Sequence, residues 1–530
     1  LVGFVYGAGT SDETVTKLIG LKNYGAMKAV PGAANANGFT STQVGCIAGL
    51  SNTSRTSTFR NLITRCANYG DMTVSTGRAS GIVAAANTFT VVSECENHGD
   101  MLNTYGESGG GRLGNITCIL GTSSVVDGCT NYGDIVATNA KTHAGGLVCL
   151  TNSADSEVVN SANYGNVITD LATYRGTLVA NINNGAKLDN NTAGGATGYH
   201  IAGIVGFSSN DGSSQQKVII SDCINYGDMT SATGRTSGIV AAANRYTQLT
   251  NCVNHGDQMN TCPKEDAGRL GNITCNMGTG SSMSGCTNYG NLTSTTGARC
   301  GGITSISNTA TFENCANYGT ILSDGSRGVF WAYNNGVAQW TNCTAGGKVG
   351  TYNNGAPVFD SYAEADQANY LGKQGSNKST LTNIVYQIGS TGGGGTGGDA
   401  ELRILFIGNS FTKDAVEHLP GILKAAGLDK VKMTHMYYGG RTVPEYNNGF
   451  ATVSDYRCYE CNPGAAGWTE LMNKTIKEVA ASDRWDIVTI QEHTGKVNAW
   501  SWTSTEKEAL QGLIDNVKST QTGAMPKFYY

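Results

Sequence analysis

The chain has 530 residues, with 35 Lys and Arg against 40 Asp and Glu, a net charge of 35 − 40 = −5. This length argues against one ordinary domain, and the charge balance gives no reason to expect nucleic acid or an anionic membrane as partner. No apolar run reaches the roughly 18 residues of a membrane-spanning helix, so no transmembrane segment is predicted. The chain opens on Leu1 without a signal peptide. We therefore expect that any targeting segment was removed or lies outside this sequence.

Residues 1–389 form a repeat array. The unit is Cys-x-Asn-(Tyr/His)-Gly, with full copies at 66, 95, 129, 223, 252, 286 and 315 and degenerate copies at 21, 161, 191 and 343. The motif asparagine position advances by (345 − 23)/10, about 32 residues, per copy. A longer period is also present, because "NYGDMT" at 68 recurs at 225 and "GRLGNITC" at 111 recurs at 268, both 157 residues later. A block of five units was therefore duplicated.

Each unit alternates about three short strand-like runs with Gly, Asn, Ser and Thr turns, and no window shows helical periodicity. One such unit is too small to bury its apolar face alone, whereas stacked coils share a core. The prediction is a mainly β protein, a right-handed parallel β-helix of about eleven coils. The array resembles the Gly-rich solenoid repeats of bacterial surface proteins and adhesins.

Nine of the 16 cysteines follow the coil register, Cys46 less clearly than the others. Stacked parallel Cβ vectors are poorly oriented for disulfides, so we expect buried, reduced thiols; a bridged or metal-binding row is the alternative. The motif Asn is expected to stack at a repeated turn and the motif Gly to supply a positive φ. His98 and His255 replace Tyr in the motif and are interpreted as turn-surface variants.

Four arginines recur in both duplicated blocks: Arg78, Arg112, Arg235 and Arg269. They are expected to cap repeated turns; the alternative is a line of guanidinium groups that binds sugar acids. The charges of the array otherwise look evenly spread.

Residues 390–399, "STGGGGTGGD", are predicted to be a flexible linker, after which charged residues become denser. In 400–530, "LRILFI" reads as a strand that breaks at "GNSF" before a helix with apolar residues at helical spacing. "VKMTHMYYGG" then predicts a strand and a Gly turn, "WTELMNKTIKEVAAS" a helix, "WDIVTIQ" a strand and "TEKEALQGLIDNVKS" a helix. This alternation predicts a parallel α/β sheet.

The order of Gly408-Asn409-Ser410, Gly439-Gly440 and "TIQEHTG" after successive strands resembles the SGNH (GDSL-like) hydrolase superfamily. It looks most like an uncharacterised branch at the C-terminus of surface proteins from anaerobic gut bacteria. The resemblance implies that Ser410 is the nucleophile and that Gly440, or less favourably Gly439, and Gln491 are oxyanion donors. Gln491 stands where the family has Asn. Asn409, Gly439 and His493 are the predicted substrate-binding residues.

SGNH enzymes take their general base from an Asp-x-x-His block near the end of the domain, and no such block follows Gln491. "PKFYY" at the end of the chain looks like the start of another strand. The expectation is therefore an incomplete domain that is inactive in this form. Cys458 and Cys461 are too few for a zinc site and predict a local surface disulfide or two free thiols. No metal or other cofactor is predicted.

Three functions remain open. The first is a secreted or surface-anchored carbohydrate (acetyl) esterase, with the solenoid as a stalk or glycan-binding scaffold. The second is a structural or adhesive surface protein whose SGNH-like domain only binds glycans. The third, ranked lowest, is a polysaccharide lyase acting on the solenoid face. All three imply a polysaccharide partner outside the cell, and surface assembly is an open prediction.

Overall fold

The protein is described by a computed structural model. It describes all residues except 1, 8–15, 30–42, 54–59, 76, 105–110, 139–141, 152–154, 170–195, 209–216, 262–267, 335, 354–355, 361–366, 374–378, 387–401, 426–427, 429, 464, 466, 493–503 and 522–524. The chain divides into two compact units, Leu1–Gly392 and Gly393–Tyr530. The division falls within the Gly-rich stretch.

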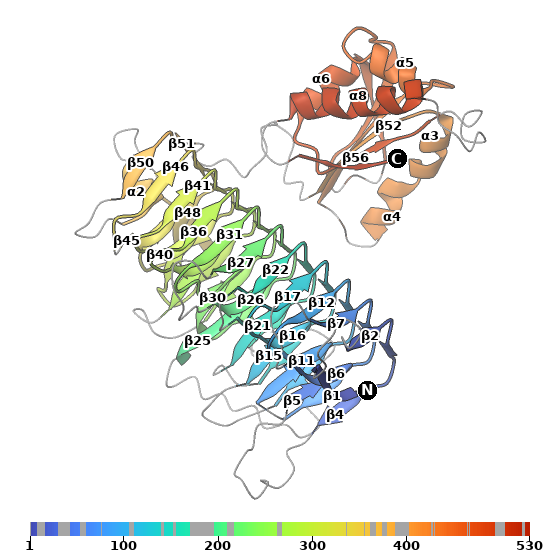
Figure 1. Cartoon of the computed structure of the whole chain (residues 1–530). Coiled ribbons are helices and arrows are strands. Elements are labelled where there is room, and N and C mark those ends of the chain that lie inside the picture. The colour runs from blue at the N-terminus through green and yellow to red at the C-terminus, as the bar shows by residue number, and fades with distance from the viewer. Residues whose placement is uncertain are drawn as a thin grey trace, which may run out of the picture. The chain divides into compact units, whose positions relative to one another are not determined.

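The first unit consists of long stacks of parallel strands, the arrangement of a β-solenoid (Figure 1). Each complete coil contributes one short strand to each of five sheets, which the chain visits in the order E, A, B, C, D. The expectation of a β-solenoid is confirmed at this level. The number of strands per coil was wrong, since five replace the expected three. The right-handed winding stays a prediction.

The strands of each sheet stack in chain order. Sheet E holds β5 (Gln43–Gly45), β10 (Arg78–Ser80), β15 (Arg112–Gly114), β20 (His143–Gly145), β25 (Ala196–Ala202), β30 (Thr233–Ser237), β34 (Arg269–Gly271), β39 (Arg299–Gly301) and β44 (Arg327–Gly328). Sheet A holds β1 (Val2–Gly7), β6 (Ala48–Thr53), β11 (Val83–Ala86), β16 (Thr117–Leu120), β21 (Val148–Thr151) and β26 (Val205–Ser208), continued through bridges at Val240 and Ala243 by β35 (Thr274–Met277), β40 (Thr304–Ser307) and β45 (Trp331–Asn334).

Sheets B, C and D each contain eleven strands. Sheet B holds β2 (Lys17–Ile19), β7 (Asn61–Thr64), β12 (Thr90–Ser93), β17 (Val125–Asp127), β22 (Glu157–Val159), β27 (Val218–Ser221), β31 (Thr247–Thr250), β36 (Ser282–Ser284), β41 (Thr311–Glu313), β46 (Gln339–Thr341) and β50 (Thr380–Thr382). Sheet C holds β3 (Lys22–Asn23), β8 (Ala67–Asn68), β13 (Glu96–Asn97), β18 (Thr130–Asn131), β23 (Ala162–Asn163), β28 (Ile224–Asn225), β32 (Val253–Asn254), β37 (Thr287–Asn288), β42 (Ala316–Asn317), β47 (Thr344–Ala345) and β51 (Val385–Tyr386).

Sheet D holds β4 (Met27–Ala29), β9 (Met72–Val74), β14 (Met101–Asn103), β19 (Ile135–Ala137), β24 (Val167–Ile168), β29 (Met229–Ser231), β33 (Gln258–Asn260), β38 (Leu292–Ser294), β43 (Ile321–Leu322), β48 (Val349–Asn353) and β49 (Ala356–Phe359). The last pair, β48 and β49, is antiparallel. A short helix, α2 (Gln367–Leu371), follows, and its Tyr370 and Leu371 are buried in the solenoid core.

The structure contains eleven coils, as predicted, but they do not correspond one to one to the eleven motif copies of the sequence. The degenerate copy at 191 lies outside the described residues, and the strands on either side of it, β23 and β28, pair directly with each other. The last coil is instead closed by β51, which pairs with β47 but carries no Cys-x-Asn motif. Backbone pairing therefore continues one coil past the recognisable repeat.

Alternation of side chains along each strand places one apolar residue per coil inside the solenoid. In sheet B, Ile63, Val92 and Val126 pair in register, and the same column continues to Phe312 and Trp340 at the far end. All of them are 0–1% exposed. Stacked coils thus share the continuous core that no single coil is large enough to form.

The motif cysteines form a buried row of free thiols, as expected. Each thiol donates to the carbonyl two residues earlier; that of Cys95, for example, lies 3.2 Å from the Ser93 oxygen and 3.5 Å from the Ile63 oxygen of the preceding coil. Cys46 departs from this row, because it precedes a sheet A strand and packs with Met72 and Leu113. Burial raises the pKa of Cys46 to about 12, so its thiolate is disfavoured at neutral pH.

The motif asparagines stack as predicted. Each Nδ2 donates to the Oδ1 of the Asn in the next coil at 2.7–2.9 Å, from Asn23 through to Asn317. The same Nδ2 also donates to the carbonyl of its own motif glycine, for example from Asn131 to Gly133 at 2.8 Å. These fully satisfied side chains make an internal hydrogen-bonded row that fixes the register of the coils.

The role expected for the motif glycine was wrong. Among the motif glycines that the structure describes, only Gly347 has a positive φ. The positive φ instead falls on the residue before the motif cysteine, as in Arg65, Glu94 and Asn251. The motif glycine is needed because coils approach closely: a Cβ on Gly133 would overlap the carbonyl of Gly99 in the preceding coil. The requirement is steric contact between coils, not turn conformation.

The Tyr or His of the motif forms a second row on the surface. Neighbouring rings stack with centroids 4.7–5.4 Å apart and planes within 4–15° of parallel. His98 and His255 take their places in this row, as expected. Because each ring inside the row covers the face of the next, these rings present their edges to solvent, and any open face is confined to the end rings, Tyr24 and Tyr318.

The arginines do not cap turns, and the even spread of charge was also wrong. Basic residues of the sheet E strands pair in register and form one line. We call this line the basic column; it contains Arg78, Arg112, His143, His200, Arg235, Arg269 and Arg299. Strand pairing gathers these residues into one line. Their common register is hidden in the sequence because the connections between them differ in length.

Stability of the solenoid should depend on the two histidines of the basic column. Burial, then Arg112 and Arg235, lowers the pKa of His143 from 6.5 to about 4, and burial lowers that of His200 in the same direction. As the pH falls from 6.5 to 4, these histidines become protonated in the unfolded chain but stay neutral in the folded chain. The free energy of unfolding therefore decreases over this range. For His143 we expect a loss of up to about 3 kcal/mol in the free energy of unfolding, and for His200 a loss of the same sign.

Denaturant unfolding at several pH values measures this effect. The double variant His143→Gln/His200→Gln should flatten the pH dependence, whereas His98→Gln, in the surface aromatic row, should leave its slope as in the parent protein. An unchanged slope in the double variant would show that protonation of the pair does not destabilise the fold.

The second unit is built on a mixed six-stranded sheet ordered β55-β54-β53-β52-β56-β57. Its strands are β52 (Leu402–Gly408), β53 (Val431–Tyr437), β54 (Tyr456–Cys461), β55 (Thr469–Lys474), β56 (Ile487–Ile490) and β57 (Lys527–Tyr529). Its helices are α3 (Ser410–Val416), α4 (Leu419–Ala425), α5 (Val443–Asn448), α6 (Ile476–Ser482) and α8 (Ser504–Thr520). Helices α3 and α4 cover one face, and α5, α6 and α8 cover the other (Figure 1).

Two expectations for this unit need correction. The segment 468–482 is not one helix: residues 469–474 form β55, and only Ile476–Ser482 is helical, starting at the capping box of Thr475 and Glu478. The sheet is not wholly parallel either, since β54 runs antiparallel to both β53 and β55. The four strands β53, β52, β56 and β57 are parallel neighbours.

Candidate functional site

The carboxyl ends of three parallel strands meet at one edge of the sheet of the second unit. Strand β52 lies between β53 and β56, with Gly408 paired to Tyr437 and Ile407 paired to Ile490. The predicted residues follow directly after these ends: Ser410 after β52, Gly439 and Gly440 after β53, and Gln491 after β56. Segments that are far apart in the sequence are thereby brought to one edge, where ligands bind in open α/β sheets.

Ser410 is the first residue of α3 and is exposed. The helix begins there because Asn409 is its N-cap: the Asn409 Oδ1 accepts from the Phe411 N–H at 3.2 Å. Asn409 is buried, and its Nδ2 donates to the Glu492 carbonyl at 3.3 Å, which ties the start of α3 to the end of β56. Asn409 thus positions Ser410. Because its amide is buried, the structure does not support the predicted contact between Asn409 and substrate.

Gly440 has a φ of +75°, which side chains rarely adopt, while a Cβ there would meet no other atom. The glycine is therefore needed for the turn itself. Gly439 has an ordinary φ, and a Cβ there would lie 3.3 Å from the Tyr437 hydroxyl. Both glycines are exposed beside the end of β53.

Gln491 is half-buried and fixed by two contacts. Its N–H donates to the Ile407 carbonyl at 3.0 Å, and its Oε1 accepts from the Thr412 hydroxyl of α3. Because the oxygen of the amide is engaged, its Nε2 is the atom left to donate to a ligand. His493, the other residue predicted in this segment, lies outside the described residues.

Glu492 is a site residue that the sequence reasoning missed. It is 2% exposed, and its carboxylate accepts from the Val443 N–H, with both oxygens 3.1 Å from that nitrogen. Through the Asn409 contact and this one, Glu492 links the ends of β56 and β52 to the start of α5. A glutamate directly after a buried strand was the available signal.

Arg441 follows Gly440 and is held between two tyrosines. Its guanidinium carbon lies 3.8 Å from the ring centroid of Tyr438, and Nη1 donates to the Tyr456 hydroxyl at 2.8 Å. Cation–π contact fixes the guanidinium beside the candidate edge. It was not predicted, because its partner Tyr456 belongs to the antiparallel strand β54.

The two described histidines of this unit are poorly suited to activate Ser410. His435 lies inside β53, 2% exposed, and burial, then Lys413, lowers its pKa to about 4. His418 follows α3, whose seven residues at about 1.5 Å each separate it from Ser410 by roughly 10 Å. A base with a pKa near 4 takes up a serine proton weakly at neutral pH.

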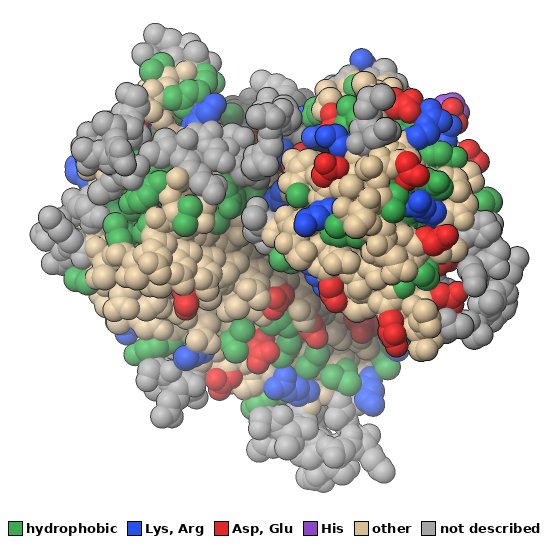
Figure 2. Space-filling model, turned by 90° about the horizontal axis from the view of Figure 1, so that it is seen from above, with side chains coloured by type: hydrophobic (Ala, Val, Ile, Leu, Met, Phe, Trp, Pro, Cys, Tyr) green, Lys and Arg blue, Asp and Glu red, His purple; other side chains and the backbone are tan. Residues whose placement is uncertain are grey.

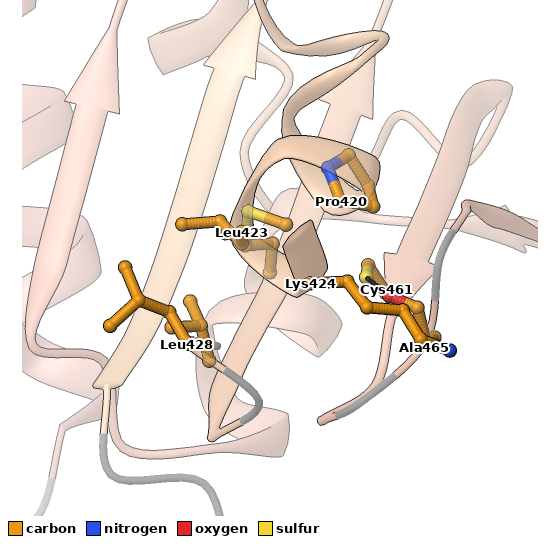
Figure 3. Close-up of a pocket in the computed structure, with 8 residues that line it drawn as sticks. Pro420, Leu423, Lys424, Leu428, Cys461 and Ala465 are labelled. Carbon is orange, nitrogen blue, oxygen red and sulfur yellow. Dashed lines mark hydrogen bonds between the residues drawn. The ribbon is translucent and has the colours of Figure 1, made fainter. Parts of the chain in front are cut away.

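Two hollows in this unit lie away from the candidate edge. One is lined by Leu423 and Lys424 of α4 and by Cys461 (Figure 3). The other has a volume of about 320 Å³ and is lined by Lys432, Cys458 and polar residues of β55 and α6. Neither is lined by Ser410, Gly440 or Gln491. On the face shown in Figure 2, acidic and basic side chains of this unit are interspersed, so no single-sign patch marks a ligand there.

Cys458 and Cys461 are free thiols and do not form a surface disulfide. They are buried on opposite faces of β54, since Cys458 packs with Leu405 and Val488 while Cys461 packs with Phe406 and Met433. Burial raises the pKa of Cys458 to about 12. Both therefore behave as small apolar residues.

Comparison with known proteins gives few relatives. No family model and no curated protein matches the chain. Among solved structures, a DUF4886 family protein from Bacteroides uniformis ATCC 8492 matches with 22% identity and a TM-score of 0.22. The match covers 24% of this chain and 48% of that protein, so the chain spans about half of its length. No helix in the described part of the chain is long and apolar enough to cross a membrane.

Proposed function

We propose that the second unit is an SGNH-like serine hydrolase that removes acyl groups, most simply acetyl groups, from carbohydrate. The observation that carries this proposal is the position of Ser410, exposed on the first turn of α3 directly after the central strand β52. A serine at a strand-to-helix turn presents its hydroxyl at a helix N-terminus, where negative charge is stabilised.

In this proposal the Ser410 Oγ attacks the ester carbonyl, and the alcohol of the sugar leaves from the tetrahedral intermediate. The developing oxyanion is held by the Ser410 N–H, the Gly440 N–H and the Gln491 Nε2. The contact between Gln491 and Thr412 supports this role, because it orients the amide before substrate binds.

Neither described histidine of this unit is suited to be the general base, since His435 has a pKa of about 4 and His418 lies at the far end of α3. Loss of ester hydrolysis in His493→Ala would assign the base to His493.

The solenoid is proposed to be a stalk or a glycan-binding scaffold, and the whole protein to act at or outside the cell surface. Its stack of coils and its Asn-, Gly- and Thr-rich composition support this reading.

A non-catalytic glycan-binding module is the second candidate. The burial of His435 favours it, because a hydrolase needs an accessible base near its serine. Ester hydrolysis by the parent protein, by Ser410→Ala and by the control Ser454→Ala separates the two functions. Loss of activity in Ser410→Ala alone supports the hydrolase, and inactivity of the parent protein on acetylated glycans supports the binding module.

A further inference from the structure

The basic column gathers cations on one side of the solenoid. Arg78 pairs with Arg112, and Arg269 pairs with both Arg235 and Arg299. The backbones of neighbouring arginines therefore lie about one strand spacing, roughly 4.8 Å, apart. Stacked like charges repel one another. Burial, then Arg235 and Arg299, accordingly lowers the pKa of Arg269.

Four arginines of the column are not neutralised by carboxylates among the residues that the structure describes. Within that part of the chain, Arg78, Arg112, Arg235 and Arg269 form no ion pair. All four are half-buried, and the Arg235 Nε is buried without a hydrogen-bond partner. The fold therefore keeps a row of cations without a carboxylate partner in the described chain, which an external anion would neutralise.

The middle of the column consists of two neutral histidines. The Arg235 Nη1 lies 2.8 Å from the His200 Nε2, and since a guanidinium only donates, this Nε2 accepts. The His200 proton must then sit on Nδ1, which lies 3.2 Å from the His143 Nδ1 and donates to it. This relay leaves the His143 Nε2–H as a further donor and joins the two arginine segments into one row.

We propose that the basic column binds a linear polysaccharide that carries a carboxylate on each sugar, lying along the solenoid axis. Each guanidinium can hold one carboxylate through two parallel hydrogen bonds. Cations on five of seven successive coils suit a polymer that carries a charge on each sugar, because a pyranose unit has a length similar to the spacing of the coils. A single small anion would occupy only one or two of these positions.

This ligand fits the column better than nucleic acid does. The chain has a net charge of −5, and the column is one residue wide, whereas nucleic-acid sites combine broad basic surfaces with exposed aromatic faces. The rings inside the aromatic row of this protein have their faces covered by stacking. The proposal is independent of Ser410, so it stands or fails separately from the hydrolase.

Calorimetric titration of the 530-residue chain with polygalacturonate oligomers tests the proposal. We expect Arg235→Gln/Arg269→Gln to weaken binding by about tenfold or more, since each lost charge-assisted contact is strong. The control Arg60→Gln/Arg245→Gln removes the same charge outside the column and should change the affinity less than twofold. Neutral dextran should not bind.

Three results would overturn the proposal: no binding of polygalacturonate, equal weakening in both double variants, or binding of single-stranded DNA as tight as that of polygalacturonate. Circular dichroism establishes that each variant is folded. If Arg235→Gln/Arg269→Gln is not, Arg235→Lys/Arg269→Lys takes its place. This pair keeps the charge but loses the two-pronged contact, and it should still bind several-fold more weakly.

Discussion

Replacing Ser410 by Ala is expected to lower the rate of ester hydrolysis by about three orders of magnitude or more, because the attacking oxygen is removed. The oxyanion donors remain, so a residual rate above that in water should persist. The measurement is kcat/KM on an aryl acetate and on acetylated glycans.

The matched control is Ser454→Ala, an exposed serine before β54, which should retain the parent rate. Replacing Gln491 by Ala should cost about 100-fold if its amide holds the oxyanion. A parent-like rate in Ser410→Ala would contradict the assignment of the nucleophile. A parent-like rate in Gln491→Ala would show only that Gln491 is not an oxyanion donor.

Replacing Gly133 by Ala should destabilise the solenoid by about 3 kcal/mol, a large effect for one methyl group. The new Cβ would overlap the Gly99 carbonyl and lie 2.9 Å from the Asn97 Nδ2. Backbone atoms of a neighbouring coil have no rotamer through which to move away, so the two coils must separate. Denaturant unfolding followed by far-UV circular dichroism measures the loss.

The control for this prediction is Gly25→Ala, at the same motif position in the first coil. No coil is described before it, and a Cβ there would meet only the Asn23 Oδ1 at 3.9 Å. We expect little change in stability. Equal destabilisation by both substitutions would show that the motif glycine serves its turn rather than the contact between coils.

Features that repeat identically were predictable from the sequence. The Cys and Asn rows follow because one residue type recurs at one register, and stacking then brings it against itself, as in Asn97 and Asn131. The function of the motif glycine was missed because its close contact is with another coil, which local turn rules do not describe. The last coil was missed because Ile384 and Tyr386 replace the motif residues while the backbone pairing continues.

The candidate site shows the same division. The placement of Ser410, Gly440 and Gln491 at one edge was predictable, because each follows a strand and parallel strands end at one edge; their roles rest on the resemblance and stay predictions. The strand β55 was taken for a helix because Glu470, Leu471 and Met472 favour helices, but pairing with β54 prevails. Glu492 and Arg441 were not predicted, because their positions depend on contacts between elements that sequence spacing does not reveal. Glu492 contacts Val443, and Arg441 contacts Tyr456.

Covalent labelling tests the central claim, that Ser410 is an activated nucleophile, most directly. The protein is treated with a fluorophosphonate, which phosphonylates activated serines, and its peptides are analysed by mass spectrometry. The account predicts one adduct on the peptide that contains Ser410, absent from Ser410→Ala and retained in Ser454→Ala. An adduct on another residue, or ester hydrolysis without any adduct on Ser410, would contradict it.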